Sequence, residues 1–318
     1  MPTHTLPPRF RTEPITIDLV GAGGNGSQML TGLARLNIAL RGLGHPHGLH
    51  VRLIDPDLVS ASNIGRQLFS PADIGLPKAS VLVNRVNLFF GLRWEAHCMK
   101  YEGMRKTEAD FIIGCVDTAA ARRSIHTAVV QKWDCYWLDL GNEEQTGQVV
   151  LGRWVKTAST DRNKRVLARM QIDGGGLDAA VPEGMTRAEL RAAKAQRLPL
   201  ITELYPHLLD KTRVEANTPS CSLAESLGRQ DLFINQGVAT FALNLLWRLF
   251  REGTIDHHGA YINMAQARVV PMPIDPAQWK RLTKIKVRRQ RPAKKAKRRT
   301  VATSKRGTHA AKRRPANK

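Results

Sequence analysis

Short apolar runs alternate with longer amphipathic segments along the first half of the chain. Apolar positions three or four residues apart are typical of a helix, whereas short β-branched or aromatic runs bounded by turn residues are typical of strands. The strand-like runs are 15–21, 50–55, 94–100, 110–117, 135–141 and 148–154, and the helical segments are 25–43, 77–91 and 119–132. Strands that alternate with helices predict an α/β fold, in which a twisted, mostly parallel sheet has helices on both faces.

The alternation stops in the second half of the chain. Residues 155–216 contain the stretch "DGGGLDAAVPEG" and one predicted helix, over 186–197, and we interpret them as an insertion or crossover segment. A helix interrupted near Gly228 is expected over 221–253. Strand-like character returns over 260–273 and closes the domain.

Positive charge is concentrated at the C-terminal end. Residues 280–318 contain 18 Lys or Arg and no Asp or Glu, so the formal charge of +22 leaves only +4 on residues 1–279. A segment this basic, with almost no aliphatic or aromatic anchor, cannot bury enough apolar surface to offset its ordering entropy. We therefore expect an extended arm over 1–14, one domain over 15–279 and a disordered polybasic tail over 280–318.

A run of cations without acids is typical of a segment that binds polyanions. Each neutralised phosphate releases counterions, so such binding is independent of sequence and weakens with salt. Residues 280–318 contain no aromatic side chain for base stacking. The tail therefore predicts nonspecific attachment to nucleic acid, while an acidic protein partner or a localising role is the other interpretation.

The four cysteines, Cys98, Cys115, Cys135 and Cys221, form no C-x-x-C pair. This spacing favours free thiols in a reducing compartment over disulfides or a structural zinc site. The first three fall in predicted strands and are expected in the core. The longest apolar stretch, "FALNLLWRLF", is too short to span a bilayer, and the N-terminus lacks the apolar region of a secretory signal. We expect a soluble cytoplasmic protein with no membrane segment.

Four glycines, Gly21, Gly23, Gly24 and Gly26, separate the first predicted strand from the following helix. Their G-x-G-x-x-G spacing allows a tight turn and close approach of a pyrophosphate, and the helix N-terminus supplies N–H donors. Asp55 ends the second strand, where an acid accepts a hydrogen bond from a ribose hydroxyl. The motif predicts a Rossmann-like nucleotide-binding domain. It does not separate NAD, FAD, S-adenosylmethionine and ATP, and alone it favours NAD.

The next loop changes that preference. The stretch "IDPDLVSASNIGRQLFSPADIGLPKAS", residues 54–80, supplies Arg66 and Lys78. Hydride transfer has little use for cations beside the phosphates, whereas α-phosphoryl transfer needs Arg, Lys and Mg²⁺ to hold negative charge while a carboxylate attacks. Asp117 ends another strand, at the sheet edge where open α/β folds bind ligands, and a carboxylate there suits Mg²⁺. These residues favour ATP and Mg²⁺.

The same stretch closely resembles the D-x-D-x-V-x-x-S-N-x-x-R-Q…D-I-G-x-x-K-A signature of the ThiF/MoeB/ubiquitin-activating family. The resemblance covers 15–154 well and 217–270 more loosely. It implies a ThiF/MoeB-type fold and adenylation of the C-terminal glycine of a ubiquitin-like or sulfur-carrier-like small protein. Homodimeric relatives donate an N-terminal arginine to the partner's phosphate site, which implies a homodimer with Arg9 or Arg11 in that role.

The resemblance also assigns roles to individual positions. Asp55 would hold the ribose, Lys78 would contact the phosphates and Asp117 would bind magnesium. The other matched positions, expected to complete the ATP site, are Asp57, Asn63, Arg66, Gln67 and, after the metal-binding aspartate, Arg122. The family commonly has Asp-Asn where this chain has Asp117-Thr118. The paired C-x-x-C motif of MoeB-like members is missing from the sequence, so no zinc is expected.

Cys221 is a candidate nucleophile because it stands just before a predicted helix start, the capping-box pattern Ser222-x-x-Glu225. A helix N-terminus favours the thiolate, and a thiolate can attack an acyl-adenylate to give a thioester. The stretch "PSCSLAES" also resembles the transferring cysteine of ubiquitin-activating enzymes, and ThiF-family members of PRTRC gene clusters. The other interpretation is that Cys221 is a small buried residue, as most free cysteines are.

Two further functions stay open from the sequence. One is adenylation of a peptide or a tRNA base without a thioester. The other is a non-catalytic ATP- or NAD-binding module that tethers partners to nucleic acid through residues 280–318.

Overall fold

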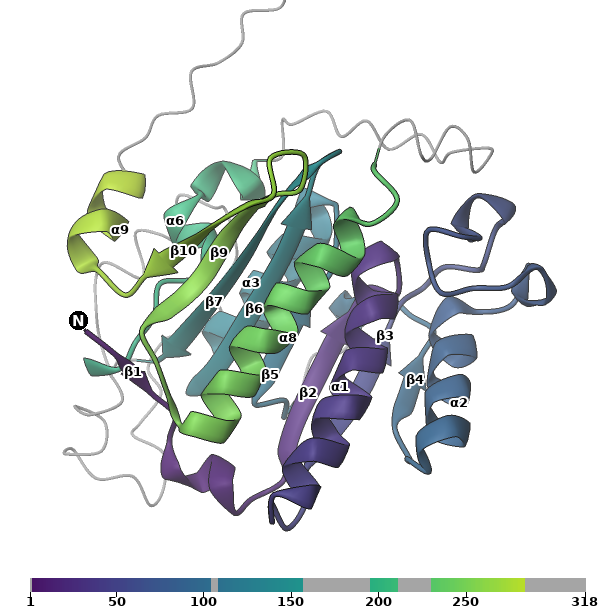
Figure 1. Cartoon of the computed structure of the whole chain (residues 1–318), viewed down its shortest axis with the longest axis horizontal. Coiled ribbons are helices and arrows are strands. Elements are labelled where there is room, and N and C mark those ends of the chain that lie inside the picture. The colour runs from purple at the N-terminus through teal and green to yellow at the C-terminus, as the bar shows by residue number, and fades with distance from the viewer. Residues whose placement is uncertain (1, 104–107, 157–194, 211–229, 284–318) are drawn as a thin grey trace, which may run out of the picture. The chain divides into compact units, whose positions relative to one another are not determined.

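The computed structural model describes residues 2–103, 108–156, 195–210 and 230–283. They contain a large mixed sheet, a two-stranded sheet and the helices that cover them (Figure 1). Most of the predicted helix at 186–197 lies outside the described residues, and so does Cys221.

The large sheet has eight strands in the order β10-β9-β7-β6-β5-β2-β3-β4. The pairs from β4 to β6 are parallel, and the pairs β6–β7, β7–β9 and β9–β10 are antiparallel. The strands are β2 (Ile15–Val20), β3 (Leu49–Ile54), β4 (Glu95–His97), β5 (Phe111–Gly114), β6 (Asp134–Asn142), β7 (Thr146–Val155), β9 (His257–Asn263) and β10 (Arg268–Pro273). The predicted α/β fold with a mostly parallel sheet is confirmed, and antiparallel strands extend the sheet on one side.

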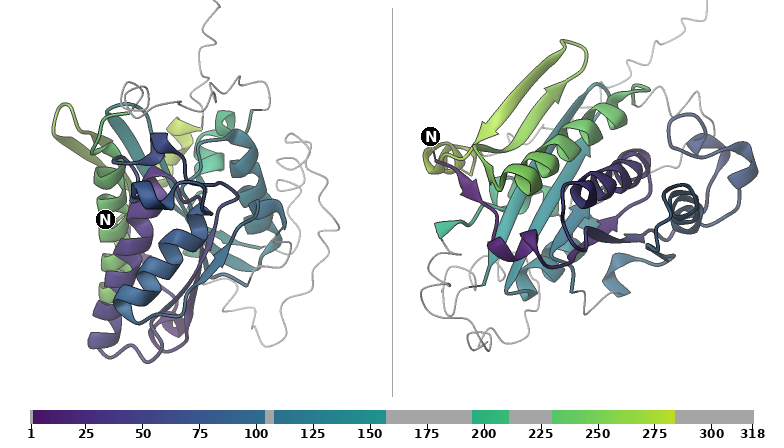
Figure 2. Two further views of the ribbon diagram at one scale, coloured as in Figure 1. Left: turned by 90° about the vertical axis from the view of Figure 1, so that its right-hand side faces the viewer. Right: turned by 60° about the horizontal axis from the view of Figure 1, so that its bottom comes forward.

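Helices cover both faces of this sheet, as the alternating pattern predicts. The α-helices are α1 (Gly24–Gly42), α2 (Lys78–Phe90), α3 (Ala119–Gln131), α6 (Ile201–Leu204), α8 (Ile234–Glu252) and α9 (Pro276–Leu282). Short 3₁₀ helices are η1 (Pro8–Arg11), η2 (Ala61–Asn63), η3 (Pro71–Asp73), η4 (Tyr101–Gly103) and η5 (Pro206–Leu209). Helices α1, α2 and α8 pack on one face, and α3 and α6 pack on the other (Figures 1 and 2).

Local sequence explains where the helices begin and end. Gly91 and Gly253 stop α2 and α8 in the left-handed conformation, with φ of 65° and 74°, which costs a glycine little. Thr118 begins α3, because its hydroxyl accepts a hydrogen bond from the Ala121 N–H at 3.1 Å. This cap places Asp117 at the junction between the end of β5 and the start of α3.

The N-terminal arm differs from the extended segment expected. Its strand β1 (His4–Thr5) pairs antiparallel with β8 (Thr254–Ile255), and η1 follows. Phe10 in η1 is 2% exposed, and its ring packs in T-shaped, edge-to-face contacts with those of Phe111 and Tyr136. Burial of this aromatic side chain favours the turn over an extended arm.

The first residues of the basic segment belong to helix α9. Asp275 starts α9 by accepting a hydrogen bond from the Ala277 N–H at 2.8 Å. Trp279 anchors the helix, because its ring nitrogen donates to Nε2 of His258 at 2.9 Å. Residues 280–282 are therefore helical, and residues 284–318 lie outside the described part of the chain.

Candidate active site

A cleft of about 1700 Å³ lies at the carboxyl ends of β2, β3, β5 and β6. This is the edge of an open α/β sheet at which ligands bind. The cleft brings together most of the residues singled out from the sequence: Gly21, Gly23, Gly24, Asp55, Asp57, Asn63, Arg66, Gln67, Lys78, Asp117 and Arg122. Gly26 does not line the cleft, and Cys221 lies outside the described residues.

The glycine loop joins β2 to α1 along one side of the cleft. Gly21 has a φ of +100°, and a Cβ there would lie 2.6 Å from the backbone oxygen of Cys115. A Cβ on Gly26 would lie 1.7 Å from the backbone oxygen of Gly21, so this glycine serves the turn rather than the ligand. A Cβ on Gly23 would meet no atom within 4 Å. The loop therefore presents open space beside the first turn of α1, as phosphate binding requires.

Asp55 connects the glycine loop to the loop after β3. One carboxylate oxygen accepts a hydrogen bond from the Ala22 N–H at 2.6 Å, and the other accepts from the Asp57 N–H at 2.8 Å. Burial raises the pKa of Asp55, and these backbone donors lower it. Asp55 therefore fixes both loops, while its contact with a ribose stays a prediction.

Lys78 is the first residue of α2 and is held over the cleft by Asp57. Its N–H donates to the Asp57 carbonyl at 3.0 Å, and its ammonium lies 3.0 Å from the Asp57 carboxylate. The Lys78 side chain is 9% exposed, whereas that of Asp57 is 62% exposed. Ion pairs with such an exposed partner are weak, so an anionic ligand can compete for the ammonium.

Arg66 contacts a neutral side chain at the cleft. Its Nη1 donates to Oε1 of Gln230 at 2.6 Å. Burial lowers the pKa of Arg66, and the nearby carboxylate of Asp117 raises it. The guanidinium therefore lies in a partly dry environment, where its attraction for a phosphate is stronger than in water.

The two polar residues beside Arg66 have different surroundings. Asn63 is the last residue of η2, and its Oδ1 accepts a hydrogen bond from the Ser60 N–H at 2.9 Å. Asn63 thus shapes the loop, and only its amide nitrogen is left for a ligand. Gln67 is 6% exposed, and its Oε1 has no hydrogen-bond partner among the residues described. A buried orphan acceptor of this kind is typical of a site that a ligand or water completes.

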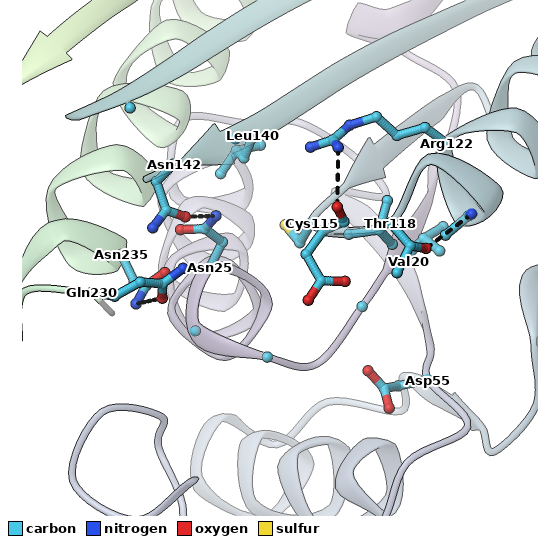
Figure 3. A pocket seen from close by; sticks show the side chains of 18 of the residues that line it. Val20, Asn25, Asp55, Cys115, Thr118, Arg122, Leu140, Asn142, Gln230 and Asn235 are labelled. Carbon is cyan, nitrogen blue, oxygen red and sulfur yellow. Dashed lines mark hydrogen bonds between the residues drawn. The ribbon is translucent and has the colours of Figure 1, made fainter. Parts of the chain in front are cut away.

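A group of amides that the sequence motifs did not indicate lies on the α8 side of the cleft (Figure 3). Asn25 on α1 donates to Oδ1 of Asn142 at the end of β6, at 2.9 Å. Asn235 of α8 lies 2.4 Å from the position that a Cβ on Gly24 would occupy. Gln230 completes the group beside Arg66. These contacts connect residues far apart in sequence, so only the folded chain reveals them.

Arg122 lines the opposite wall, and Asp139 lies buried behind it. Arg122 Nε lies 3.3 Å from Oδ1 of Asp139, which is fully buried on β6. Burial raises the pKa of Asp139, and Arg122 lowers it. The sequence could have indicated that Asp139 is buried and paired, because it stands in the apolar run "CYWLDLG" and a buried acid rarely lacks a partner.

The described cysteines are structural or peripheral. Cys135 is buried, and Cys115 is half-buried at the end of β5. Burial raises the pKa of both thiols, which disfavours the reactive thiolate. The expectation that Cys98 is a core residue is wrong, because it follows the edge strand β4 and is exposed.

The arginines of the arm do not reach the cleft of their own chain. Arg9 forms an ion pair with Asp110 at 2.8 Å, and Asp110 precedes β5, at the end of the strand opposite to Asp117. Arg11 lies against Gly253 at the end of α8. A contribution of either residue to a second copy stays a prediction.

Metal ligands are sparse in the described part of the chain. No group of three or more His, Cys, Asp or Glu side chains gathers there to hold an ion. A magnesium ion bound by one carboxylate and phosphate oxygens needs no such cluster, and Asp117 lines the cleft as such a carboxylate. No helix among the described residues is long and apolar enough to cross a bilayer.

Known proteins resemble the chain over different lengths. Ubiquitin-like modifier-activating enzyme 6 of Mus musculus is 34% identical over 121 residues, which are 35% of this chain and 11% of that protein. The NEDD8-activating enzyme E1 catalytic subunit of Saccharomyces cerevisiae is 31% identical over 118 residues, 36% of each chain. This chain thus spans about a third or less of the length of these relatives.

Solved structures align over more of the chain. The crystal structure of E. coli MccB with MccA-N7isoASN has 14% sequence identity and a TM-score of 0.48, and it covers 82% of this chain and 64% of that one. The crystal structure of PaaA has 16% identity and a TM-score of 0.46, with the same coverage. The model of the ThiF family matches residues 12–250, which include the glycine loop, the whole 54–80 loop, Asp117 and α8. The chain therefore belongs to the ThiF family.

Proposed function

We propose that this chain is an ATP-dependent adenylyltransferase that activates the C-terminal carboxylate of a small ubiquitin-like or sulfur-carrier-like protein. One observation carries the proposal: the glycine loop, Arg66, Lys78 and Asp117 line a single cleft. Membership of the ThiF family supports the same chemistry at a general level. The activating enzymes among the relatives are named for ubiquitin-like modifiers, which supports a small protein as the substrate.

The reaction is an in-line displacement at the α-phosphorus of ATP. An oxygen of the substrate carboxylate forms a bond to the α-phosphorus, the bond from that phosphorus to the bridging oxygen breaks, and pyrophosphate leaves with the electron pair. The glycine loop and the first turn of α1 bind phosphate oxygens through N–H donors. Arg66 and Lys78 stabilise the charge that moves onto the leaving group.

Partial desolvation strengthens this stabilisation. Lys78 is 7% exposed as a whole residue, and burial lowers the pKa of Arg66, so both cations lie largely out of water. Their present partners are the exposed carboxylate of Asp57 and the neutral amide of Gln230. The ion pair of Lys78 with the exposed Asp57 is weak, so a phosphate can compete for its ammonium.

Asp117 is the residue that would hold a magnesium ion. It follows β5 at the cleft and lies close enough to Arg66 to act on its pKa. A bound magnesium would neutralise phosphate charge. With one carboxylate from the chain, the ion would take its other ligands from the nucleotide and from water.

The far part of the cleft suits an extended peptide. It continues from Gly141 along β7 and β9, where Gln148 and Asn263 line it. Amide side chains offer both donors and acceptors, as a peptide backbone requires. A C-terminal tail entering along these strands would reach the glycine loop with its carboxylate in front.

Transfer of the acyl group to Cys221 would be the second step. The thiolate would attack the acyl carbonyl carbon, a carbon–sulfur bond would form, and AMP would leave with the electrons of the broken acyl–oxygen bond. This step rests on the sequence context of Cys221 alone.

The test begins with nucleotide binding by the full-length protein. Titration calorimetry with ATP and with NAD separates the adenylyltransferase from a dinucleotide-binding module. Lys78→Ala should weaken ATP binding by about tenfold, the loss of roughly one charge-assisted contact. Arg85→Ala is the matched control, because Arg85 lies on the same helix α2, pairs with Asp73 and does not line the cleft.

Catalysis is then measured as ATP–pyrophosphate exchange. The acceptors are small proteins and synthetic peptides that end in Gly-Gly. Exchange that depends on such an acceptor and is lost in Lys78→Ala supports the proposal. Binding of NAD in preference to ATP, or exchange that survives in Lys78→Ala, would contradict it.

A further inference from the structure

Two buried ion pairs at opposite ends of β6 differ in their geometry. At the start of the strand, both Nε and Nη2 of Arg153 donate to the carboxylate of Asp134, at 2.9 and 2.7 Å. Near its end, Asp139 receives only one contact from Arg122, from Nε at 3.3 Å. The first pair uses the full fork of the guanidinium, whereas the second leaves the terminal nitrogens for another partner.

Those terminal nitrogens of Arg122 lie at the cleft. Nη1 is 3.5 Å from the backbone oxygen of Asp117, and Nη2 is 3.5 Å from the position that a Cβ on Gly141 would occupy. A contact of 3.5 Å is at the limit of a hydrogen bond, so these donors keep most of their capacity. Figure 3 shows the guanidinium of Arg122 on the side of the cleft opposite to the amides. Both Asp117 and Gly141 line the cleft.

The burial of the Asp139 carboxylate is unfavourable for the stability of the fold. It is 0% exposed, and its Oδ2 has no hydrogen-bond partner among the residues described. Burial of a carboxylate with one long contact destabilises a fold relative to apolar packing. Its neighbours on β6, Leu138 and Leu140, show that the strand otherwise holds apolar side chains in the core.

We propose that Asp139 is a positioning residue that holds Arg122 by its Nε, so that the two terminal nitrogens bind an anionic oxygen group between Asp117 and Gly141. The inference rests on the proposed function, because the anion is either a phosphate of ATP or the substrate carboxylate that attacks it. Because Asp139 compensates the charge of Arg122, the guanidinium acts through directed donors and favours a ligand of the right geometry. Lys78, by contrast, is paired with the largely exposed carboxylate of Asp57.

The experiment measures affinities of the full-length protein by titration calorimetry. The probes are ATP, inorganic pyrophosphate and 5′-O-(glycylsulfamoyl)adenosine, which mimics an acyl-adenylate. The variants are Arg122→Gln, Asp139→Leu, the double variant and Asp139→Asn. Each of the first two should weaken at least one probe by about tenfold, a typical loss for a directed contact to an anion.

Two further results separate positioning from general stability. The double variant should lose no more affinity than the weaker-binding single variant, because both changes remove the same interaction. Asp139→Asn keeps an acceptor for Nε and should stay within about threefold of the wild type. The control is Asp134→Asn, which disturbs the other arginine pair of β6 away from the cleft and should leave all affinities unchanged.

The pattern among the probes identifies the anion. Losses confined to ATP and pyrophosphate assign it to the phosphates. A loss confined to the acyl-adenylate mimic, whose acyl carbonyl stands where the substrate carboxylate binds, assigns it to that carboxylate. Unchanged affinities in Arg122→Gln, or additive losses in the double variant, would overturn the inference. The proposed function would still stand in that case, provided that the wild type binds ATP. A wild type that binds none of the probes would overturn both.

Discussion

Acidification below neutral pH should destabilise the protein through three buried histidines. His4, His126 and His258 are 1%, 2% and 0% exposed, and burial lowers the pKa of each from 6.5 to about 4. In His258 burial outweighs the contact of Nδ1 with the Leu151 carbonyl, which raises the pKa, and Nε2 accepts a hydrogen bond from the ring N–H of Trp279. The folded protein therefore resists protonation at these sites, whereas the unfolded chain does not.

The sign and size of the effect follow from proton linkage. Between pH 6.5 and pH 4 the unfolded state binds more protons than the folded state, so the free energy of unfolding falls as the pH is lowered. One histidine with this shift costs about 2 kcal/mol at pH 5 relative to pH 8, and three cost about 6 kcal/mol. Domains are stable by about 5–15 kcal/mol, so the loss is a large fraction of the total.

Buried carboxyl groups reduce this loss. Burial raises the pKa of Asp55 and Asp139, so their protonation in acid relieves an unfavourable buried charge. Their contribution has the opposite sign to that of the histidines. The figure of about 6 kcal/mol is therefore an upper bound for the sum.

Urea unfolding at pH 8, pH 6 and pH 5 measures the effect. His126→Gln and His258→Gln should each reduce the loss between pH 8 and pH 5 by about 2 kcal/mol, whatever their stability at pH 8. The control is His47→Gln, because His47 is exposed and should leave the pH dependence unchanged. A wild type whose unfolding free energy changes by less than about 1 kcal/mol over this range would refute the reasoning.

Three further predictions concern the cleft and the segments outside the described residues. Gly26→Ala should abolish ATP binding, because its Cβ would lie 1.7 Å from the Gly21 oxygen. The control is Gly42→Ala on the same helix α1, whose Cβ meets open space and which should bind ATP normally. Titration calorimetry compares the ATP affinities of the two variants. Cys221→Ala should keep ATP–pyrophosphate exchange and lose a thiol-sensitive adduct with the acceptor, seen by electrophoresis with and without reductant; a surviving adduct would exclude Cys221. Removal of residues 284–318 should lower nucleic-acid affinity and its salt dependence without changing ATP affinity, and unchanged filter binding would contradict the role of the tail.

Much of the fold could be predicted from the sequence because its signals are local. Apolar runs such as 15–21 and 110–117 mark buried parallel strands, and both lie within about three residues of β2 and β5. The cleft followed from a topological rule, since loops at the carboxyl ends of neighbouring parallel strands must meet. That rule brings Asp55 and Asp117 to the same edge although they are distant in sequence.

Contacts between distant segments could not be predicted. The partner of Arg66 is Gln230, and the partner of Arg122 is Asp139; each pair depends on how α8 or β6 packs rather than on spacing. Cys98 is exposed rather than in the core, because it follows an edge strand. The arm was misjudged because the value of burying Phe10 depends on the rings of Phe111 and Tyr136, which only tertiary structure supplies.

The pairing of β1 with β8 has a consequence for synthesis of the chain. Strand β1, His4–Thr5, finds its partner only when Thr254–Ile255 has been synthesised. Helix α8, which packs against α1 and the middle of the sheet, also comes late. Phe111 of β5, which packs against Phe250 of α8, therefore stays without this cover until α8 is synthesised. This late closure predicts that the emerging chain depends on chaperones that shield apolar surface until α8 arrives.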